Sequence, residues 1–533
     1  MSLLEIEGLT LSIHGDTILR DVSLSVDPGQ IVGVIGESGS GKSMTAFSVL
    51  QLLPNGSVCD GRVTLSGHDI LQMPEPDLCA LRGSEVGMVF QEPMTALNPI
   101  RTIGDQVAET ILVHQDTSRA EAMKRAREAL NRVELPEDRF PMNRYPHQLS
   151  GGQRQRVVIA MAIALRPKLL IADEPTTALD VTTQAQILDL LTRLVREDGM
   201  GMLMITHDLA VVSDMADQIV IMQNGRVVES GRCPGIFSTL KHPYSQALLE
   251  ASSHVPDRAA PATQTALLQV VDVVRDYRMP RKTLLGKPQI VNAVRGVTFD
   301  VERGESLGLV GESGCGKSTL TRAILGLDRI QGGSIQLDGE PVFDGHQVNR
   351  AVRRRMQVVF QDPYGSFNPR HQVARLVSEP FHLLDSPPKG DERDAAIDDA
   401  LISVGLGPED KTKYIHEFSG GQRQRIAIAR ALIIKPDLII LDEAVSALDV
   451  QVRAQILDLL ADLSARFGLT YLFISHDLSV VRSITDRVLV MKSGEIVEQG
   501  PTDAVFDAPQ HPYTQQLIAA APKLPETAES AVP

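Results

Sequence analysis

Short runs of apolar residues recur along the chain, and they end either at a glycine-rich turn or at an acidic pair. Two of the runs predict a strand that enters a glycine-rich turn and is followed by a helix. The strands are Gln30 to Ile35 and Ser306 to Val310, and the helices are residues 44–53 and 319–327. Two other runs, Leu169 to Ala172 and Leu438 to Leu441, are uninterrupted, as expected of strands buried on both faces of a parallel sheet. Together they predict an α/β fold.

Charged residues with helical spacing fill two long stretches between these strands. The stretches are Pro93 to Gln148 and Pro363 to Glu417, and each predicts a helical subdomain inserted into an α/β core. The order of elements around them is the same in both parts of the chain. We therefore expect two similar units, each with a mixed sheet core and an inserted helical subdomain.

The chain repeats itself, and the repeat defines the domains. Lys42 recurs in the same setting as Lys317, 275 residues later. Three further motifs recur with a constant spacing of 269 residues, and one of them, Thr206-His207-Asp208, returns as Ser475-His476-Asp477. Because the spacing is constant across separate motifs, a whole domain has been duplicated. The predicted organisation is a first domain at 1–252, a linker at 253–266 and a second domain at 267–533 that ends in a short C-terminal tail.

The composition limits the class of protein. Of 533 residues, 43% are hydrophobic and 22% are charged, which is ordinary for a folded globular protein. The formal net charge of -15 disfavours nucleic acid as a partner, because phosphate backbones would be repelled. The sequence has no apolar run of about 18 residues and no secretion signal, so we expect neither a membrane span nor secretion. Four widely separated cysteines predict free thiols rather than disulfides.

Two copies of the pattern Gly-x-x-x-x-Gly-Lys-Ser follow the first pair of strands. Glycines at these positions let backbone N–H groups surround a phosphate, with the positive end of the next helix behind them. The lysine would reach the β- and γ-phosphates, and the serine hydroxyl would bind Mg²⁺. The expected nucleotide-binding residues are Gly36, Ser38, Gly39, Gly41, Lys42 and Ser43 in the first loop, and Gly311, Ser313, Gly314, Gly316, Lys317, Ser318 and Thr319 in the second. The alternative is a glycine-rich turn without a ligand, and the duplication argues against it.

An acidic pair follows each uninterrupted apolar run, and a histidine follows a further run in each half. The pairs are Asp173-Glu174 and Asp442-Glu443. Each aspartate is placed to hold Mg²⁺, while each glutamate can polarise the water that attacks a phosphate. The histidines could bind the γ-phosphate or orient that water, although a structural role is the alternative for each of them alone. The predicted catalytic residues are Glu174, Glu443, His207 and His476.

These motifs resemble those of the ATP-binding-cassette family over nearly the whole chain. The resemblance also rests on the signature segments Leu149 to Gln153 and Phe418 to Gln422, and on D-loops at 178–180 and 447–449. It implies two P-loop ATPase domains in tandem. Each of the two ATP sites would lie between the phosphate loop of one half and the signature of the other. The signature residues implied to bind nucleotide are Ser150, Gly151, Gly152, Gln153, Ser419, Gly420, Gly421 and Gln422.

A closer resemblance is to the importer branch that handles peptides, oligopeptides and nickel, including its twin-cassette members. It rests on the segments Phe90 to Pro99 and Phe360 to Pro369, and on a repeated His-Pro-Tyr at 242–244 and 511–513. It implies that a glutamine in each of the two long segments senses the γ-phosphate and contacts both nucleotide and metal. The full set of implied Mg²⁺ ligands is Ser43, Gln91, Asp173, Ser318, Gln361 and Asp442.

The chain departs from the family pattern at several positions. Tyr277 stands where an aromatic side chain normally stacks on adenine in the second half, whereas the first half has Ile13 or His14 there. Adenine contact should therefore be weaker in the first site. Ala444-Val445 replaces the usual Pro-Thr after the second acidic pair, and Phe418 replaces leucine in the second signature. None of these changes removes a catalytic group, so we expect both sites to hydrolyse ATP.

The resemblance implies an ATP-hydrolysing motor for a bacterial importer, with ATP and Mg²⁺ as cofactors. It would act with two membrane permease subunits and an extracytoplasmic substrate-binding protein, and would lie at the cytoplasmic face of the inner membrane through the permeases. Peptides are the expected substrates, but dipeptides, oligopeptides, glutathione and metal chelates stay open because this subunit does not touch them. The alternative is a soluble twin-cassette protein acting on ribosomes, although such proteins have a long charged linker and this chain does not.

Cys315 lies within the second phosphate loop, where the first loop has Ser40. A thiol near a helix start and a lysine tends to have a lowered pKa, so we expect Cys315 to be the most reactive of the four cysteines. The alternative is that a small residue simply fits a tight loop. An adduct on Cys315 would block the second ATP site alone.

Overall fold

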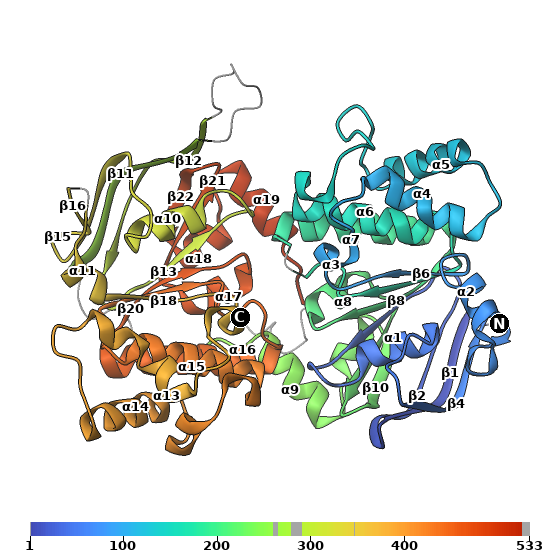
Figure 1. Cartoon of the computed structure of the whole chain (residues 1–533), viewed down its shortest axis with the longest axis horizontal. Helices are drawn as coiled ribbons and strands as arrows, with labels where there is room; N and C mark the ends of the chain where they lie inside the picture. Colours follow the sequence, from blue (N-terminus) through green and yellow to red (C-terminus); the bar gives the residue numbers. More distant parts are fainter. Residues whose placement is uncertain (1, 178, 259–264, 279–289, 346, 525–533) are drawn as a thin grey trace. The chain divides into compact units, whose positions relative to one another are not determined.

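The computed structural model describes residues 2–177, 179–258, 265–278, 290–345 and 347–524 (Figure 1). The chain divides into two compact units, which are described separately below. The first comprises Met1–Leu179 and Thr183–Ser252 with a short piece from Pro522 onward, and the second comprises Asp180–Thr182 and Ser253–Ala521. Of the predicted segments, Ala178 of the first D-loop, residues 259–264 of the linker and residues 525–533 of the tail lie outside the described residues.

The first unit contains a six-stranded mixed sheet and a four-stranded antiparallel sheet. The six strands have the order β10-β9-β3-β8-β7-β6, in which only the β10-β9 pair is antiparallel. Their bounds are Ile31–Ile35 (β3), Val86–Val89 (β6), Leu169–Asp173 (β7), Gly201–Thr206 (β8), Gln218–Gln223 (β9) and Arg226–Arg232 (β10). The second sheet has the order β2-β1-β4-β5. Its strands are Leu4–Ile13 (β1), Asp16–Val26 (β2), Ser57–Leu65 (β4) and His68–Asp69 (β5).

The helices of the first unit include the predicted helical subdomain. Helices α4, α5 and α6 pack against one another, and α6 also contacts β6 of the mixed sheet (Figure 1). The bounds are Lys42–Leu50 (α1), Glu75–Leu81 (α2), Pro93–Ala96 (α3), Ile103–His114 (α4), Arg119–Arg132 (α5), Gly151–Ile163 (α6), Val181–Asp198 (α7), Leu209–Met215 (α8) and Pro243–Ser252 (α9). The α/β core with an inserted helical subdomain is therefore confirmed for this unit.

The second unit repeats this architecture. Its six-stranded sheet has the order β18-β19-β20-β13-β21-β22, its four-stranded sheet has the order β12-β11-β14-β15, and a small β16-β17 hairpin is added. The strands are Ala266–Arg278 (β11), Ile290–Glu302 (β12), Ser306–Val310 (β13), Gly332–Leu337 (β14), Glu340–Pro341 (β15), Phe343–Asp344 (β16), Gln347–Val348 (β17), Met356–Val359 (β18), Leu438–Asp442 (β19), Thr470–Ile474 (β20), Arg487–Lys492 (β21) and Glu495–Pro501 (β22).

Helices α13, α14 and α15 pack together as the helical subdomain of the second unit. The helices of this unit are Lys317–Ile324 (α10), Arg350–Arg354 (α11), Pro363–Ser366 (α12), Val373–Val377 (α13), Asp391–Ser403 (α14), Gly420–Leu432 (α15), Val450–Phe467 (α16), Leu478–Ile484 (α17), Thr502–Asp507 (α18) and Pro512–Ala520 (α19). Across the described ranges, no helix combines the length and the apolar character needed to cross a bilayer.

The helices after the two phosphate loops were predicted about two residues too late along the chain. Residues 44–53 and 319–327 were expected, but α1 begins at Lys42 and α10 begins at Lys317. The physical reason is the preceding glycine, whose positive φ (102° at Gly41 and 118° at Gly316) turns the chain directly into the first helical turn. The lysine and serine of each motif therefore stand in the first turn of the helix.

The phosphate-loop helix of each unit is held in place by an apolar core that both sheets share. In the first unit, Val49 of α1 belongs to one buried cluster with Leu4 of β1 and Val34 of β3. In the second unit, Ile324 of α10 is buried in the same way with Leu309 of β13. Burial on this scale fixes the helix, and with it the position of the loop that precedes it.

Candidate active sites

The first phosphate loop connects β3 to α1, and its glycines are of two kinds. Gly36 is packed, because a Cβ atom there would lie 2.2 Å from the carbonyl oxygen of Met222. Gly39 has a φ of +80° and open space where a Cβ atom would lie. Gly311 and Gly314 repeat both features in the second loop. Each loop is thus tight on its protein side and open beside the helix N-terminus, where a phosphate fits.

The lysine of each loop is buried and donates hydrogen bonds to the loop itself. Lys42 Nζ lies 2.6 Å from the carbonyl oxygen of Gly36 and 2.9 Å from that of Glu37. Lys317 Nζ lies 2.6 Å and 3.0 Å from the matching oxygens of Gly311 and Glu312. Each ammonium group is therefore held within the loop, on the side where the phosphates of a nucleotide would be bound.

Oxygen donors suited to Mg²⁺ stand beside each loop. The hydroxyl of Ser43 donates to Asp173 Oδ1 at 3.1 Å, which brings the two predicted metal ligands together. Burial raises the pKa of Asp173, and the Ser43 hydrogen bond partly opposes this. Burial, together with the charge of Glu443, raises the pKa of Asp442 to about 6. A serine hydroxyl and one carboxylate fit an ion that keeps several waters and otherwise binds substrate phosphates.

Glu174 is held by three side chains that approach its two carboxylate oxygens. His207 Nδ1 lies 3.3 Å from Oε1, and both Gln91 Nε2 and Thr177 Oγ1 donate to Oε2 at 2.9 Å. Burial alone would raise the pKa of Glu174, but the His207 hydrogen bond and charge, with Thr177 and Lys42, lower it to about 2. The backbone at Glu174 has a φ of 46°, a strained conformation for a residue with a side chain.

Glu443 has the same backbone setting, with a φ of 52°, but a different set of neighbours. His476 Nδ1 lies 3.3 Å from its Oε2, whereas the hydroxyl of Ser446 donates to the main-chain oxygen of Glu443 at 2.9 Å. Burial would raise the pKa of Glu443, and the bond and charge of His476 lower it below its usual range. Burial would lower the pKa of His476, but Glu443 raises it. The structure thus pairs a glutamate with a histidine in both units, and the four paired residues are those that the sequence offers as catalytic candidates.

The signature segments form the starts of α6 and α15. Ser150 is the N-cap of α6, and its side chain and that of Gln153 make a reciprocal capping box. Ser419 and Gln422 do the same for α15. The two glutamines, which were predicted to bind nucleotide, therefore cap a helix in this structure.

The paired glycines of each signature differ in their surroundings. A Cβ atom on Gly152 would lie 2.2 Å from Thr183 Cγ2, and one on Gly421 would lie 2.4 Å from Val452 Cγ1. The nearest atom to such a Cβ is 3.6 Å away at Gly151, and none lies within 4 Å at Gly420. Close helix packing therefore explains the second glycine, while the first leaves the helix N-terminus open to an anion.

Strand register shows which residue of the first unit corresponds to Tyr277, the residue expected to stack on adenine in the second. Ile13 stands nine residues after Leu4, which pairs with Leu65. Tyr277 stands nine residues after Leu268, which pairs with Leu337 in the matching sheet. Ile13 is therefore the counterpart of Tyr277, and His14 is not. The hydroxyl of Tyr277 donates to Asp328 Oδ2 at 3.0 Å, and the guanidinium of Arg275 lies 4.6 Å from the ring centroid.

The tyrosine of each His-Pro-Tyr motif contacts a phosphate loop, and the sequence did not predict these contacts. Glu37 N–H donates to the hydroxyl of Tyr244 at 2.9 Å, and Glu312 N–H donates to that of Tyr513 at 3.0 Å. The motifs lie more than 200 residues after the loops, so a local sequence pattern could not reveal the contact. The one indication in the sequence that the motifs have a role in each half was that both halves contain them.

The expectation for Cys315 was wrong. Its side chain is buried in the second unit, and burial raises the pKa of its thiol more than Lys317 lowers it. Cys79 is the exposed cysteine, and all four cysteines are free, as predicted. A thiol facing an apolar core is protonated and shielded, so the neighbouring helix start and lysine do not make it reactive.

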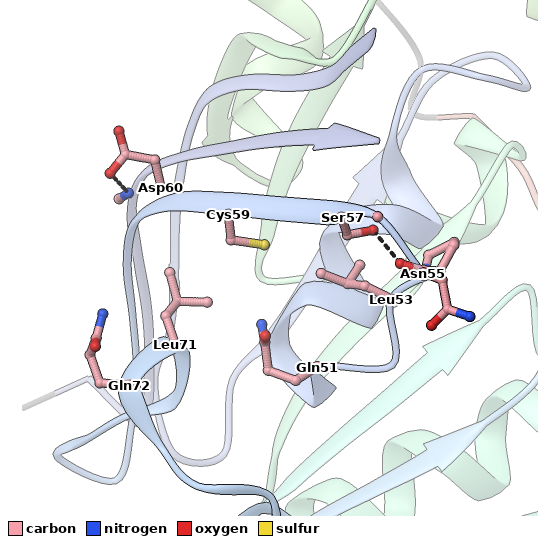
Figure 2. A pocket seen from close by; sticks show the side chains of 11 residues that line it. Gln51, Leu53, Asn55, Ser57, Cys59, Asp60, Leu71 and Gln72 are labelled. Atoms are coloured by element: carbon pink, nitrogen blue, oxygen red, sulfur yellow. Dashed lines mark hydrogen bonds between the residues drawn. The ribbon is translucent and has the colours of Figure 1, made fainter. Parts of the chain in front are cut away.

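In each unit, one cavity is lined by residues at an end of the helix that follows the phosphate loop. The cavity of the first unit, about 430 Å³, is lined by Gln51, Cys59 and Leu71 among others (Figure 2). Since Gln51 caps the C-terminal end of α1, this cavity is at the opposite end of the helix from the phosphate loop. The cavity of the second unit, about 710 Å³, reaches from Glu443 to Arg430 of the helical subdomain.

Comparison with known proteins agrees with this geometry. The family model described as "ABC transporter" matches residues 19–177 and 294–446, which is more than half of the chain. The chain belongs to the ABC transporter family. A second model of the family's peptide importers, "Oligopeptide/dipeptide transporter, C-terminal region", matches residues 497–532. The α/β fold with two P-loop ATPase domains in tandem is thereby confirmed.

Curated ABC transporter ATPases match the chain over nearly its whole length. "Glutathione import ATP-binding protein GsiA" of Escherichia coli O157:H7 is 45% identical over 565 residues, covering 98% of this chain and 90% of the relative. "Peptidoglycan transport ATP-binding protein YejF" of Agrobacterium fabrum is 45% identical over 526 residues, covering 97% of this chain and 96% of the relative. The chain is therefore an ABC-type ATPase that binds ATP.

Proposed function

We propose that this ABC transporter ATPase is the motor subunit of a bacterial importer of peptides or related compounds. The observation that carries the proposal is the match, over nearly the full length, to ATPases named for glutathione import and peptidoglycan transport. The oligopeptide/dipeptide C-terminal region at 497–532 supports the same substrate class. The substrate itself is not chosen by this subunit, so dipeptides, oligopeptides, glutathione and metal chelates all stay within the proposal.

Two ATP sites would form within the one chain. In each site we place the phosphate loop of one half opposite the signature of the other, as the family resemblance implies. The N-termini of α6 and α15 support this arrangement, since each leaves space at its first glycine and has a positive dipole end suited to a γ-phosphate. Lys42 and Lys317 would leave the loop carbonyl oxygens and bind the β- and γ-phosphates.

The two residues of each acidic pair would have different roles in ATP hydrolysis. Ser43 and Asp173, with Ser318 and Asp442 in the second half, would hold Mg²⁺, which neutralises charge on the phosphate oxygens. The lowered pKa values of Glu174 and Glu443 keep both carboxylates ionised at neutral pH, so each can accept a hydrogen bond from the attacking water. The paired histidine fixes the orientation of the carboxylate.

Gln91 and Gln361 would connect hydrolysis to transport. Gln91 donates its amide N–H to Glu174. Its amide oxygen could then bind the metal or accept a hydrogen bond from the water. Gln361 lines the 710 Å³ cavity of the second unit together with Glu443 and the half-exposed Phe360. Since this cavity extends to the helical subdomain, a permease segment bound in it would contact the glutamine directly.

The partners we propose are two membrane permease subunits and an extracytoplasmic substrate-binding protein. The chain would then be peripheral, bound to the cytoplasmic face of the inner membrane through the permeases. The net charge of -15 agrees with an assembly that does not use nucleic acid. The ribosome-acting alternative has no named relative among those described above.

Co-purification tests this proposal. The tagged chain, expressed with its candidate permeases and extracted in mild detergent, should retain both permeases through a wash in high salt, which would remove a contact made by surface charge alone. Phe360→Glu should weaken this retention, and ATP binding is to be measured in the same variant because Ser318 and Asp442 line the same cavity. Loss of both permeases together with sedimentation of the wild-type chain on ribosomes would contradict the proposal.

A further inference from the structure

The C-terminal helix of each unit contacts the phosphate loop through one tyrosine. Tyr244 stands in the first turn of α9 and Tyr513 in the first turn of α19, and both side chains are buried. Each hydroxyl oxygen accepts the N–H of the residue that follows the first glycine of the loop, at 2.9 Å from Glu37 and 3.0 Å from Glu312. The contact is thus the same in two units whose sequences have diverged.

A short network in the first unit fixes the position of Tyr244. The carboxylate of Glu229, on β10, accepts the N–H groups of Lys241 at 2.8 Å and His242 at 3.3 Å. His242 Nδ1 in turn accepts the N–H of Tyr244 at 3.2 Å. Together with the proline at the first helical position, these bonds fix the start of α9 against the sheet.

The second unit repeats the network 269 residues later. Glu498, on β22, accepts the N–H groups of Gln510 at 2.7 Å and His511 at 3.0 Å. His511 Nδ1 accepts the N–H of Tyr513 at 3.1 Å, and Lys492 Nζ lies 4.6 Å from the centre of the Tyr513 ring. The repetition of each donor and acceptor indicates a function that both nucleotide sites need.

The peptide unit between Gly36 and Glu37 bonds to both the tyrosine and the loop lysine. Its carbonyl oxygen, that of Gly36, accepts Lys42 Nζ at 2.6 Å, while its N–H, that of Glu37, donates to Tyr244. If Lys42 turned to the phosphates of ATP, it would give up that carbonyl oxygen, while the Glu37 N–H could still donate to Tyr244. The tyrosine bond is therefore suited to hold the start of the loop with and without nucleotide.

We propose that Tyr244 and Tyr513 are positioning residues for ATP, acting through the phosphate loop. By fixing the first peptide of the loop, each hydroxyl directs the N–H groups that follow it toward the phosphates. Neither tyrosine touches the reacting atoms. The His-Pro-Tyr motif would then serve nucleotide binding in each half, independently of the transported substrate.

The test is Tyr244→Phe combined with Tyr513→Phe, which removes both hydroxyls and keeps both rings. Because each loop N–H loses a buried acceptor, KM for ATP should rise about 5- to 10-fold, while kcat stays within about twofold. Each single variant should weaken one of the two sites when a fluorescent ATP analogue is titrated, and leave the other unchanged.

Tyr471→Phe is the matched control. Tyr471 is a buried tyrosine of the second unit whose hydroxyl donates to the carbonyl oxygen of Leu460 at 3.0 Å, away from the loop. It should lower the melting temperature and leave KM unchanged. The proposal is overturned if the double variant keeps a wild-type KM, or if Tyr471→Phe raises KM as much as Tyr513→Phe does.

Discussion

Glu174 and Glu443, the two glutamates that we propose as catalytic bases, have the same backbone conformation but differ in how many side chains hold their carboxylates. Glu174 receives hydrogen bonds from Gln91 and Thr177 in addition to the contact with His207. Within the part of the chain that the structure describes, the side chain paired with the Glu443 carboxylate is His476. The comparison shows that duplication kept the histidine and the backbone, while the residues around them diverged.

The divergence follows from a few substitutions after the acidic pair. Thr177 directs its hydroxyl to the carboxylate of Glu174, whereas Ser446 directs its hydroxyl to the main chain of Glu443. Ala444 and Val445 are buried in the apolar core of the second unit, so packing stabilises this turn in place of Pro175 and Thr176. We expect both sites to hydrolyse ATP and the second to turn over faster, since fewer bonds must break to free its base.

Removing the histidine that is paired with each glutamate should expose this difference most strongly. His476→Ala in a Glu174→Gln background should reduce the remaining turnover about 100-fold, because Glu443 loses its main partner. His207→Ala in a Glu443→Gln background should cost about tenfold, since Gln91 and Thr177 still hold Glu174. Steady-state ATP hydrolysis measures both.

The pH dependence of ATP hydrolysis by the same variants is a second test of this difference. His476 lowers the pKa of Glu443, so its loss raises that pKa and should move the acidic limb of the rate profile to higher pH. After His207→Ala the acidic limb should stay at lower pH than after His476→Ala, because Thr177 still lowers the pKa of Glu174. Equal losses, and acidic limbs at the same pH in the two backgrounds, would contradict the proposed asymmetry.

Adenine contact should differ between the sites by a smaller factor. Tyr277→Ala should weaken ATP binding at the second site about tenfold through the loss of a stacking surface, and Ile13→Tyr should tighten the first site by a similar or smaller factor. Tyr277→Phe keeps the ring and removes the bond to Asp328, so it serves as the control and should bind nearly as wild type. Two-site titration with ATP would refute this account if Tyr277→Phe and Tyr277→Ala weaken binding equally.

In the absence of Mg²⁺, the two aspartates that we propose as its ligands should affect the stability of the fold. The pKa of Asp442 is raised from 3.8 to about 6, so the folded chain binds this proton more tightly than the unfolded chain. Stability is therefore lost as pH rises from about 4 to about 6, and above that the cost is at most about 3 kcal/mol. Asp442→Asn should raise the melting temperature by a few degrees at pH 8 and by less at pH 5.

Asp173→Asn is the comparison for that measurement. The hydroxyl of Ser43 opposes the effect of burial on the pKa of Asp173, so the gain in melting temperature at pH 8 should be smaller. Both chains are to be unfolded without nucleotide and with a metal chelator. A gain at pH 5 that equals the gain at pH 8 would show that the charge of Asp442 is not the cause.

Much of each site could be predicted from the sequence, because the residues expected to act on ATP directly follow β-strands. Glu174 follows β7 and His207 follows β8, and these two strands are parallel neighbours. Their carboxyl ends therefore meet at one edge of the sheet, and a pattern of apolar runs suffices to bring the pair together. The same reasoning holds for Glu443 and His476, which follow β19 and β20.

The remaining features depend on packing between segments that are distant in sequence. The bond of Tyr244 to the loop requires α9 to fold back onto the segment that follows β3, and no local pattern encodes that path. The pKa of Cys315 is set by the apolar core around it, and the rule based on a nearby lysine fails there. The choice between Ile13 and His14 needed strand register, which one bulge is enough to change.

The measurement that tests the central claim most directly is ATP turnover by the permease-bound complex carrying Glu174→Gln, Glu443→Gln or both. The double variant should lose at least about 100-fold in turnover while still binding ATP, because no base remains. Of the single variants, Glu174→Gln should retain more activity than Glu443→Gln. Turnover near wild type in the double variant would contradict the assignment of these glutamates, and greater activity in Glu443→Gln than in Glu174→Gln would contradict the proposed difference between the sites.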